Sequence, residues 1–214
     1  TSQPGGTVWV NDTSSVSRIF DQRLTYNKGS YLVYMLRFVL GDSMFFSAIR
    51  QYLNTPSLAY GFTQTAKLKS VLEQASGKDL TDFFNQWYLG QGYPSYKASW
   101  SQVGTGTVHI NLSQVTSHPS VSFFKMPVPL TFKKGNLQKT VVLNNTENNQ
   151  DFIEDIGFVA DTVLIDPELW LISKNNSTEK KSISNSGMGG VDIFPNPVVS
   201  PASIRLHDFN TTKA

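Results

Sequence analysis

Histidine and acidic side chains are the first candidates for catalysis, because a chain without cysteine would hold a metal mainly through them. The sequence has His109, His118 and His207, and it contains no H-E-x-x-H motif, which places two zinc ligands on one face of a helix. His109 lies in an alternating run beside Asn111 and is predicted to point away from the core. We therefore expect no metal site within this chain.

Other catalytic arrangements are also missing from the sequence. There is no G-x-S-x-G motif for a serine nucleophile, and no predicted helix follows the glycines of SGMGGVD, residues 186–192, to form a phosphate loop. The net charge of +2, with scattered basic residues, argues against a nucleic-acid surface. No apolar run reaches the ~18 to 20 residues that a membrane-spanning helix needs. The composition, 39% hydrophobic and 16% charged, is typical of a globular protein with a sizeable core.

A further candidate is the tyrosine that precedes an apolar helix in LTYNKGSYLVYMLRFVLGD, residues 24–42. From the residues alone, we interpret Tyr26 as an aromatic side chain that packs on the core where the helix begins. Lys28 is then a solvated lysine of the first turn, and Gly29 allows close packing of the helix. These residues do not define an active site by themselves.

The chain from residue 1 to about residue 92 is predicted to be helical after a polar, irregular entry. Residues 27–40 are apolar almost all round, as in an interior helix, and Gly41 is placed to end that helix. Asp42 is expected to cap the next helix, which continues to about residue 53. Two more helices are predicted, one from about residue 68 to Gly77 and one from Asp79 to about residue 89. The last of them carries a group of aromatic residues at core spacing: Phe83, Phe84, Trp87 and Tyr88.

From Pro94 to about residue 173 the hydrophobic period changes to two, which predicts strands. The clearest case is TVHINL, residues 107–112. Turn signals at residues 104–106, 134–136 and 144–145 separate the candidate strands, and residues 166–168 (Asp-Pro-Glu) are expected to form a turn with solvated carboxylates. The other candidates are PVPLTF, TVVL, DTVLI and LWLIS, at residues 127–132, 140–143, 161–165 and 169–173. We predict a multidomain α+β protein with a helical domain (1–92) and a small antiparallel β-sandwich (93–173).

Two further segments follow the predicted sandwich. Residues 174–190, KNNSTEKKSISNSGMGG, lack an apolar period and are rich in serine, asparagine and glycine, which predicts a flexible linker. Residues 191–214 begin VDIFPNPVVSPASIRLHDF and have strand character. They are too few to enclose a core of their own.

In order and spacing, four features together resemble the C-terminal half of the gluzincin zinc aminopeptidases, the family of membrane alanyl aminopeptidase and leukotriene A4 hydrolase. They are YNKGSYLVYMLRFVLGD, which matches the family's Tyr-x-Lys-Gly helix; FFSAIRQYL; SGKDLTDFFNQWYLGQGYP, which matches its Ser-Gly-x-Asp-Leu, Phe-Phe-x-x-Trp and Gly-x-Pro elements; and a sandwich entered directly from that proline. The resemblance implies the helical C-terminal part of a thermolysin-like catalytic domain, followed by a β-sandwich. It also implies removal of N-terminal residues from a peptide substrate.

This resemblance implies a catalytic role for Tyr26. In the family, the tyrosine at this position donates its hydroxyl to the oxyanion that forms when zinc-bound water attacks the scissile carbonyl. The family's H-E-x-x-H helix, its further glutamate ligand and the segment that grips the substrate's free amine match nothing in this chain.

Because the chain also begins at Thr1 without a methionine, we expect a C-terminal fragment of a longer enzyme. Zinc would be held by the intact parent, and the fragment itself would have no cofactor and no activity. Removal of the upstream catalytic domain should leave apolar surface on the first helix, through which the fragment could dimerise.

The tail has a second resemblance, in VDIFPNPVVSPASIRL, residues 191–206. It is similar to the start of the C-terminal sorting domain of the bacterial type nine secretion route, whose members begin with a short strand and a Pro-Asn-Pro turn. This resemblance implies that the parent is secreted or displayed on the cell surface. The alternative is a generic Pro-Asn-Pro turn in a loose tail.

A different class of function stays open beside the peptidase. The protein could be a noncatalytic surface binding or adhesion protein in which the sandwich engages a ligand and the helices are a degenerate peptidase-like region. Outward-facing aromatic residues on the sandwich would favour this alternative, and buried ones would weigh against it. The candidates are Trp100, Phe123, Phe124 and Trp170.

Overall fold

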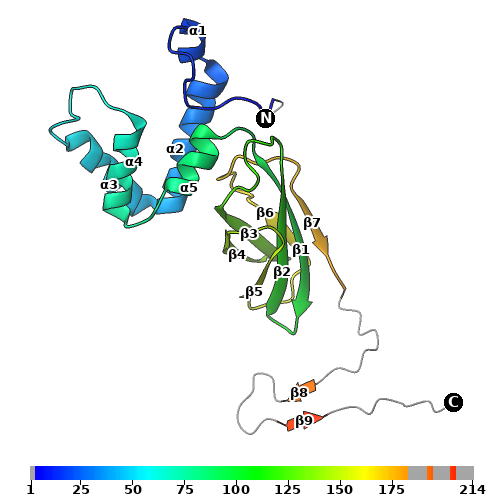
Figure 1. The fold of residues 1–214 in the computed structure, drawn as a ribbon. Coiled ribbons are helices and arrows are strands. Elements are labelled where there is room, and N and C mark those ends of the chain that lie inside the picture. Colours follow the sequence, from blue (N-terminus) through cyan, green and yellow to red (C-terminus); the bar gives the residue numbers. More distant parts are fainter. Residues whose placement is uncertain (1–2, 183–191, 195–202, 206–214) are drawn as a thin grey trace. The chain divides into compact units, whose positions relative to one another are not determined.

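The computed structural model describes residues 3–182 and, in two short strands, the backbone of residues 192–194 and 203–205. The chain divides into two compact units, Thr1–Lys181 and Ser182–Ala214. The first unit contains a helical part followed by two β-sheets (Figure 1). The predicted α+β fold with antiparallel sheets is therefore confirmed.

The helices of the described chain lie close to the predicted ones but not at every end. They are α1 (Val16–Ile19), the π-helical η1 (Gln22–Lys28), α2 (Gly29–Leu40), α3 (Asp42–Asn54), α4 (Thr65–Ser76), α5 (Thr81–Phe83) and the π-helical η2 (Phe84–Leu89). The segment predicted as an irregular entry thus contains α1 and η1. A π-helix uses the same residue types as an α-helix, so hydrophobic periodicity does not reveal it.

The junction of α2 and α3 differs from the prediction at Asp42. Gly41 turns the chain there with a φ of 79°, a conformation that glycine adopts without strain. Asp42 is the first residue of α3 and does not cap it. Its carboxylate accepts hydrogen bonds from Nε and Nη2 of Arg37, both at 2.7 Å, which occupies the two oxygens that a cap would use. By contrast, α4 ends as predicted at Gly77, which is left-handed with a φ of 68°.

Two sheets form the sandwich, and their strands lie in the orders β5-β2-β1-β7 and β4-β3-β6. All neighbouring pairs are antiparallel except β1 and β7, which are parallel. The strands are β1 (Pro94–Val103), β2 (Thr107–Thr116), β3 (Met126–Lys134), β4 (Leu137–Asn145), β5 (Gln150–Asp155), β6 (Thr162–Ile165) and β7 (Ser177–Lys180). As the alternation in TVHINL predicts, Val108, Ile110 and Leu112 of β2 are fully buried.

The segment after β6 corrects two predictions. LWLIS, residues 169–173, forms no strand, because the Asp166 carboxylate accepts the backbone N–H groups of Trp170 and Leu171, each at 2.8 Å, and so bends the chain. Asp166 itself is buried rather than solvated, at 3% exposure. Burial raises the pKa of this carboxyl, although the two backbone N–H groups oppose that rise.

The predicted flexible linker also starts too early. Residues 177–180 form β7, although every side chain of that strand is exposed. Its pairing is supported by an ion pair of 2.8 Å between Lys97 and Glu179, and by the Lys180 ammonium 4.7 Å from the centre of the Trp100 ring. Composition alone misses an edge strand that is held by backbone pairing and charge. Residues 183–190 of the predicted linker lie outside the described residues.

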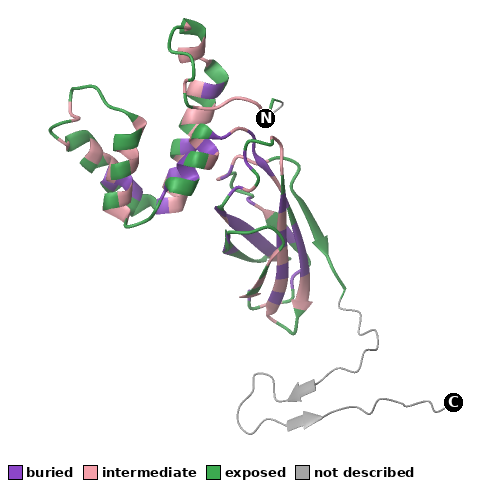
Figure 2. Ribbon diagram, in the orientation of Figure 1, coloured by how far each residue is buried: buried purple, intermediate pink, exposed green. Residues whose placement is uncertain are grey.

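A single hydrophobic core extends through the helical part and the sandwich (Figure 2). The two are joined where Trp87 of η2 packs on Phe124, with ring centroids 4.4 Å apart. The packing prediction for the last helix is confirmed, since Phe83, Phe84 and Trp87 are all buried.

The second unit contains β8 (Asp192–Phe194) and β9 (Ser203–Arg205), which pair antiparallel with Ile193 opposite Ile204. The Pro-Asn-Pro turn at residues 195–197 lies outside the described residues. In the described part of the chain, no helix is both long enough and apolar enough to cross a bilayer.

Candidate catalytic tyrosine and the adjoining cavity

Tyr26 lies in η1, the π-helical segment that leads directly into α2. Asp21 caps this segment by accepting the backbone N–H of Leu24 at 2.6 Å. The backbone N–H of Tyr26 donates to the carbonyl of Asp21 at 3.3 Å. This bond joins residues five positions apart, as in a π-helix, and holds the backbone of Tyr26 in place. Single π-helical turns occur frequently at functional sites, where they place a side chain differently from a regular α-helix.

The Tyr26 side chain is 48% exposed, which does not fit the interpretation that it simply packs on the core. Within residues 3–182, its hydroxyl makes no hydrogen bond. Tyr31 in the next turn differs, because its hydroxyl donates to the carbonyl of Leu169. The phenol of Tyr26 can therefore donate a hydrogen bond to an external group.

Lys28 is not the solvated lysine that its position in the first turn predicts. Its side chain turns inward, and the ammonium donates to the carbonyl of Gly90 at 3.2 Å and of Gly6 at 3.4 Å. Burial, and next the positive charge of Arg23, lower the pKa of Lys28 to about 8. Gly29 is not required by packing either, since a Cβ there would lie 3.6 Å from Val8, an ordinary contact distance.

Two glycines of the GQGYP segment connect η2 to the sandwich in a way that no other residue would allow. A Cβ on Gly90 would lie 2.2 Å from the Gln86 carbonyl oxygen. A Cβ on Gly92, where φ is 89°, would lie 2.8 Å from Cβ of His118. These contacts explain in physical terms why the chain has glycine at both positions.

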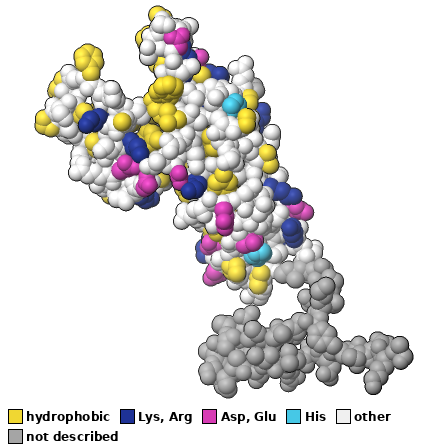
Figure 3. Space-filling model, viewed as in Figure 1, with side chains coloured by type: hydrophobic (Ala, Val, Ile, Leu, Met, Phe, Trp, Pro, Cys, Tyr) yellow, Lys and Arg dark blue, Asp and Glu magenta, His cyan; other side chains and the backbone are white. Residues whose placement is uncertain are grey.

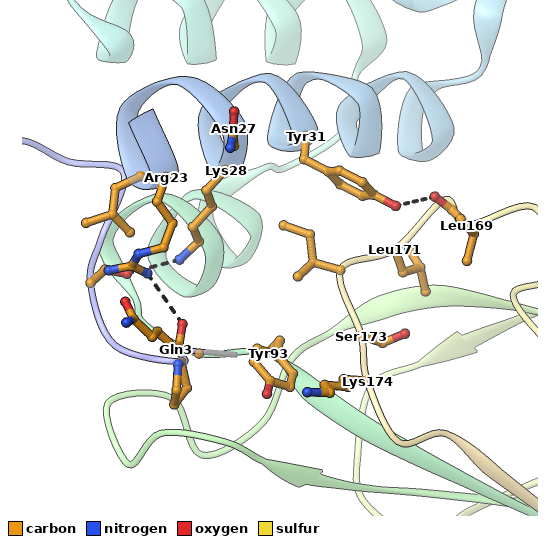
Figure 4. A pocket seen from close by; sticks show the side chains of 15 residues that line it. Gln3, Arg23, Asn27, Lys28, Tyr31, Tyr93, Leu169, Leu171, Ser173 and Lys174 are labelled. Atoms are coloured by element: carbon orange, nitrogen blue, oxygen red, sulfur yellow. Dashed lines mark hydrogen bonds between the residues drawn. The ribbon is translucent and has the colours of Figure 1, made fainter. Parts of the chain in front are cut away.

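A cavity of about 540 Å³ lies beneath η1 and α2 (Figure 4). Four separate stretches of the chain line it, and Tyr26 is not among the lining residues. They are residues 3–6, residues 23–31 of η1 and α2, residues 92–93, and residues 169–174 after β6. Sequence reasoning missed this cavity, because its lining residues are far apart along the chain.

The two described histidines take part in separate local contacts. Nε2 of His109 lies 3.2 Å from Oδ1 of Asp151 on the neighbouring strand, and Nδ1 of His118 lies 3.0 Å from Oγ of Ser120. His207 is outside the described residues. Among the residues that the structure describes, no group of three histidine, cysteine or acidic side chains could hold a metal ion.

Known proteins resemble both the sequence and the fold. Residues 2–87 match the peptidase family M1 domain. Alanine/arginine aminopeptidase of Saccharomyces cerevisiae is 33% identical over 156 residues, which cover 69% of this chain and 18% of the relative. Aminopeptidase N of Lactococcus lactis subsp. lactis is 35% identical over 89 residues, or 42% of this chain and 10% of the relative. The chain thus spans less than a fifth of the length of these relatives.

The fold of this chain also matches that of a solved aminopeptidase structure. The crystal structure of Legionella pneumophila aminopeptidase A in complex with aspartic acid aligns with 84% of this chain and 20% of its own, with a TM-score of 0.63 and 12% sequence identity. At that identity the match is evidence for the fold alone.

The match to the M1 family implies zinc, but the described residues of this chain do not make up a zinc site. No catalytic step through a metal follows from them. What the family match and the relatives do establish is that residues 2–87 of this chain are a region of the peptidase M1 family, the gluzincin aminopeptidases.

Proposed function

We propose that this chain forms the end of the catalytic helical part, and the adjoining sandwich, of a zinc aminopeptidase that removes N-terminal residues from peptides. The observation that carries this proposal is the half-exposed Tyr26 phenol, held in a π-helical turn inside the M1 region. In this proposal the zinc ligands and the general base come from residues outside this chain, so the chain alone neither binds catalytic zinc nor hydrolyses peptides.

The role proposed for Tyr26 is to donate a hydrogen bond to the oxyanion of the tetrahedral intermediate. A phenol stays protonated at neutral pH, so it can serve as a donor throughout the reaction. One fixed donor that meets developing negative charge contributes about 3 to 4 kcal/mol to the transition state. Its attachment to η1, which is continuous with α2, supports such a fixed position.

Replacement of Tyr26 by phenylalanine in the complete aminopeptidase tests this role. Tyr26→Phe removes only the hydroxyl, so kcat should fall roughly 100- to 1,000-fold while the zinc content stays the same. The matched control is Tyr60→Phe, which removes a hydroxyl from a fully exposed ring in the loop between α3 and α4. Retained activity in Tyr26→Phe would contradict the assignment.

We also propose that the helical part contacts further protein through its exposed apolar side chains. Figure 3 shows hydrophobic side chains gathered over the helical part, and Val33 and Phe46 are both 44% exposed. The isolated chain should therefore dimerise or bind a hydrophobic dye. This proposal would be contradicted if light scattering showed a monodisperse monomer and fluorescence showed that this monomer binds no dye.

The noncatalytic binding alternative receives no support from the sandwich aromatics. Trp100 and Phe124 are buried, at 2% and 0% exposure. Trp170 stacks on Tyr34 with ring centroids 4.7 Å apart. Trp170 and Phe123 are both only partly exposed. These rings contribute to internal packing, so they do not form an aromatic binding face.

For localisation, we propose that the parent is secreted, or displayed on the cell surface, through the type nine route. The motif at residues 191–206 supports this proposal, and so does the pairing of β8 with β9 on either side of the Pro-Asn-Pro segment. Deletion of residues 191–214 in the native bacterium should retain the protein inside the cell envelope. Unchanged amounts in the medium and on the surface after cell fractionation would argue for the generic-turn alternative.

A further inference from the structure

The cavity beneath η1 has the size of a small-molecule site. Its volume of about 540 Å³ lies within the roughly 300 to 1,000 Å³ of typical ligand pockets. Figure 4 shows Arg23 and Lys28 extending from the helical segment on one side, and Tyr93, Ser173 and Lys174 on the other. The walls thus come from the helical part and from the sandwich.

The charge that lines this cavity has a single sign. Arg23, Lys28 and Lys174 are among its lining residues, and none of those residues is aspartate or glutamate. Within the part of the chain that the structure describes, none of the three cations forms an ion pair with a carboxylate. As far as the described residues go, the cavity is therefore positively charged and has no protein counter-ion.

Lys28 is the cation for which a counter-ion would matter most. Among the described residues, its ammonium donates only to the backbone carbonyls of Gly6 and Gly90. Burial, followed by the positive charge of Arg23, lowers its pKa to about 8. A buried charge without a partner is unfavourable, and an opposite charge offsets that cost. Arg23 has donors to spare, because Nη1 alone makes its two hydrogen bonds to the carbonyls of Gln3 and Gly5.

Apolar groups form much of the remaining wall. Leu24, Leu171 and Ile172 line the cavity, and the Tyr31 ring is anchored beside them by its hydroxyl bond to Leu169. An inorganic anion would leave this surface unused. We infer that the cavity is a binding site for a small organic anion, namely a carboxylate carried on an apolar body.

Calorimetric titration of the full chain with 4-phenylbutyrate, at low ionic strength and neutral pH, tests the inference. The carboxylate should bind, and 4-phenylbutanamide, its uncharged analogue, should bind at least about tenfold more weakly, since a charged hydrogen bond is lost. Lys28→Met should weaken binding of the carboxylate by a similar factor, and Lys28→Arg should restore most of it. Lys174→Met provides a second variant, which should also weaken binding of the carboxylate. Lys174 is exposed and lies on the wall of the cavity opposite Lys28, so this substitution does not alter the protein interior.

The matched control is Lys67→Met, which removes the same charge from an exposed site on α4, away from the cavity. Its affinity should equal that of the unmodified chain. Any one of three outcomes would overturn the inference. The first is equal affinity for the acid and the amide, and the second is a loss of affinity in Lys67→Met as large as that in Lys28→Met. The third is unchanged affinity in both Lys28→Met and Lys174→Met.

The pH dependence gives an independent readout. The charged and titratable groups that line the cavity with Lys28 are Arg23 on η1, Tyr31 on α2, Tyr93 before β1 and Lys174 after β6. Raising the pH from neutral to about 9.5 should deprotonate Lys28 and weaken binding, whereas Lys28→Met should bind weakly and show little change over this range. The same pH dependence in both proteins would contradict a role for Lys28.

Discussion

A buried glutamine of the β-sandwich and two polar residues of the helical region differ in their hydrogen-bond partners. In the sandwich, Gln114 is buried at 4% exposure and joins two strands and a loop. Its amide nitrogen donates to the Phe124 carbonyl and to Oδ1 of Asn145, both at 3.0 Å, and its amide oxygen accepts the Phe124 N–H at 2.8 Å. In the helical region, the Tyr26 hydroxyl makes no hydrogen bond and the Lys28 ammonium donates only to backbone carbonyls, as far as the described residues show.

Two tyrosines differ in accessibility rather than in hydrogen bonding, because within the described residues the buried hydroxyl of Tyr96 has no hydrogen-bond partner either. Tyr96 in β1 is almost completely buried, and burial, followed by the nearby Asp166, holds the pKa of its phenol far above the usual range. A phenol in that position cannot reach a substrate. The comparison teaches that the sandwich is built for stability, and that side chains available for chemistry or binding lie in the helical region and along its border with the sandwich.

The largest expected effect on stability comes from the residue that joins the two regions. Trp87 is completely buried and packs on Phe124, so Trp87→Ala should lower the free energy of unfolding by about 3 to 5 kcal/mol. Denaturant unfolding, followed by circular dichroism, measures this loss. Trp9→Ala, at a site 47% exposed, is the control and should cost far less. If Trp87→Ala also separates the unfolding into two transitions, the two regions have independent stability and the comparison becomes sharper.

A smaller loss is expected within the sandwich from Gln114→Leu. The substitution keeps the side chain about the same size but leaves the Phe124 N–H and Oδ1 of Asn145 without their partner, at about 1 to 3 kcal/mol for each buried group. Equilibrium unfolding in urea gives the difference. Gln51→Leu, on the exposed face of α3, is a matched control that should be nearly neutral. A neutral Gln114→Leu would mean that the sandwich does not depend on its polar network.

Much of this division could be predicted from the sequence, because it follows from hydrophobic periodicity. The buried face of β2 and the helix end at Gly77 were correctly predicted, since each depends on residues within one short window. Strand β1 is not among the predicted strands, because its inward face has only the small Ala98 between Tyr96 and Trp100, and Ser99 on the opposite face is polar although it is buried. β7 was missed because it has no apolar side chain and forms only by pairing with β1.

The candidate site was less accessible to such reasoning. The role of Tyr26 came from the resemblance to a family, since nothing in its immediate neighbours predicts a π-helical turn or an open hydroxyl. Lys28 was misjudged because its burial depends on Gly6 and Gly90, 22 and 62 positions away. Sites assembled from distant segments cannot be read from local spacing alone.

The smallest expected effect concerns the stability that Lys28 contributes at different pH values. Its pKa is about 8 in the folded chain and 10.5 when unperturbed, so the unfolded state binds more protons between these two values. Stability should therefore rise with pH from about 8 to 10.5, as the folded protein loses the cost of a buried charge. The gain is on the order of 1 to 2 kcal/mol, because the ammonium is still partly hydrated.

Comparison of the unmodified chain with Lys28→Met, by urea unfolding at neutral pH and at about pH 10, isolates this contribution from the other titrating groups. The stability difference between the two proteins should shift in favour of the unmodified chain as the pH rises, while Lys67→Met should show no such shift. Parallel curves for all three proteins would mean that Lys28 is as well hydrated as a surface lysine. The border between the two regions would then hold no buried, poorly hydrated charge, and the contrast between the regions would rest on Tyr26 alone.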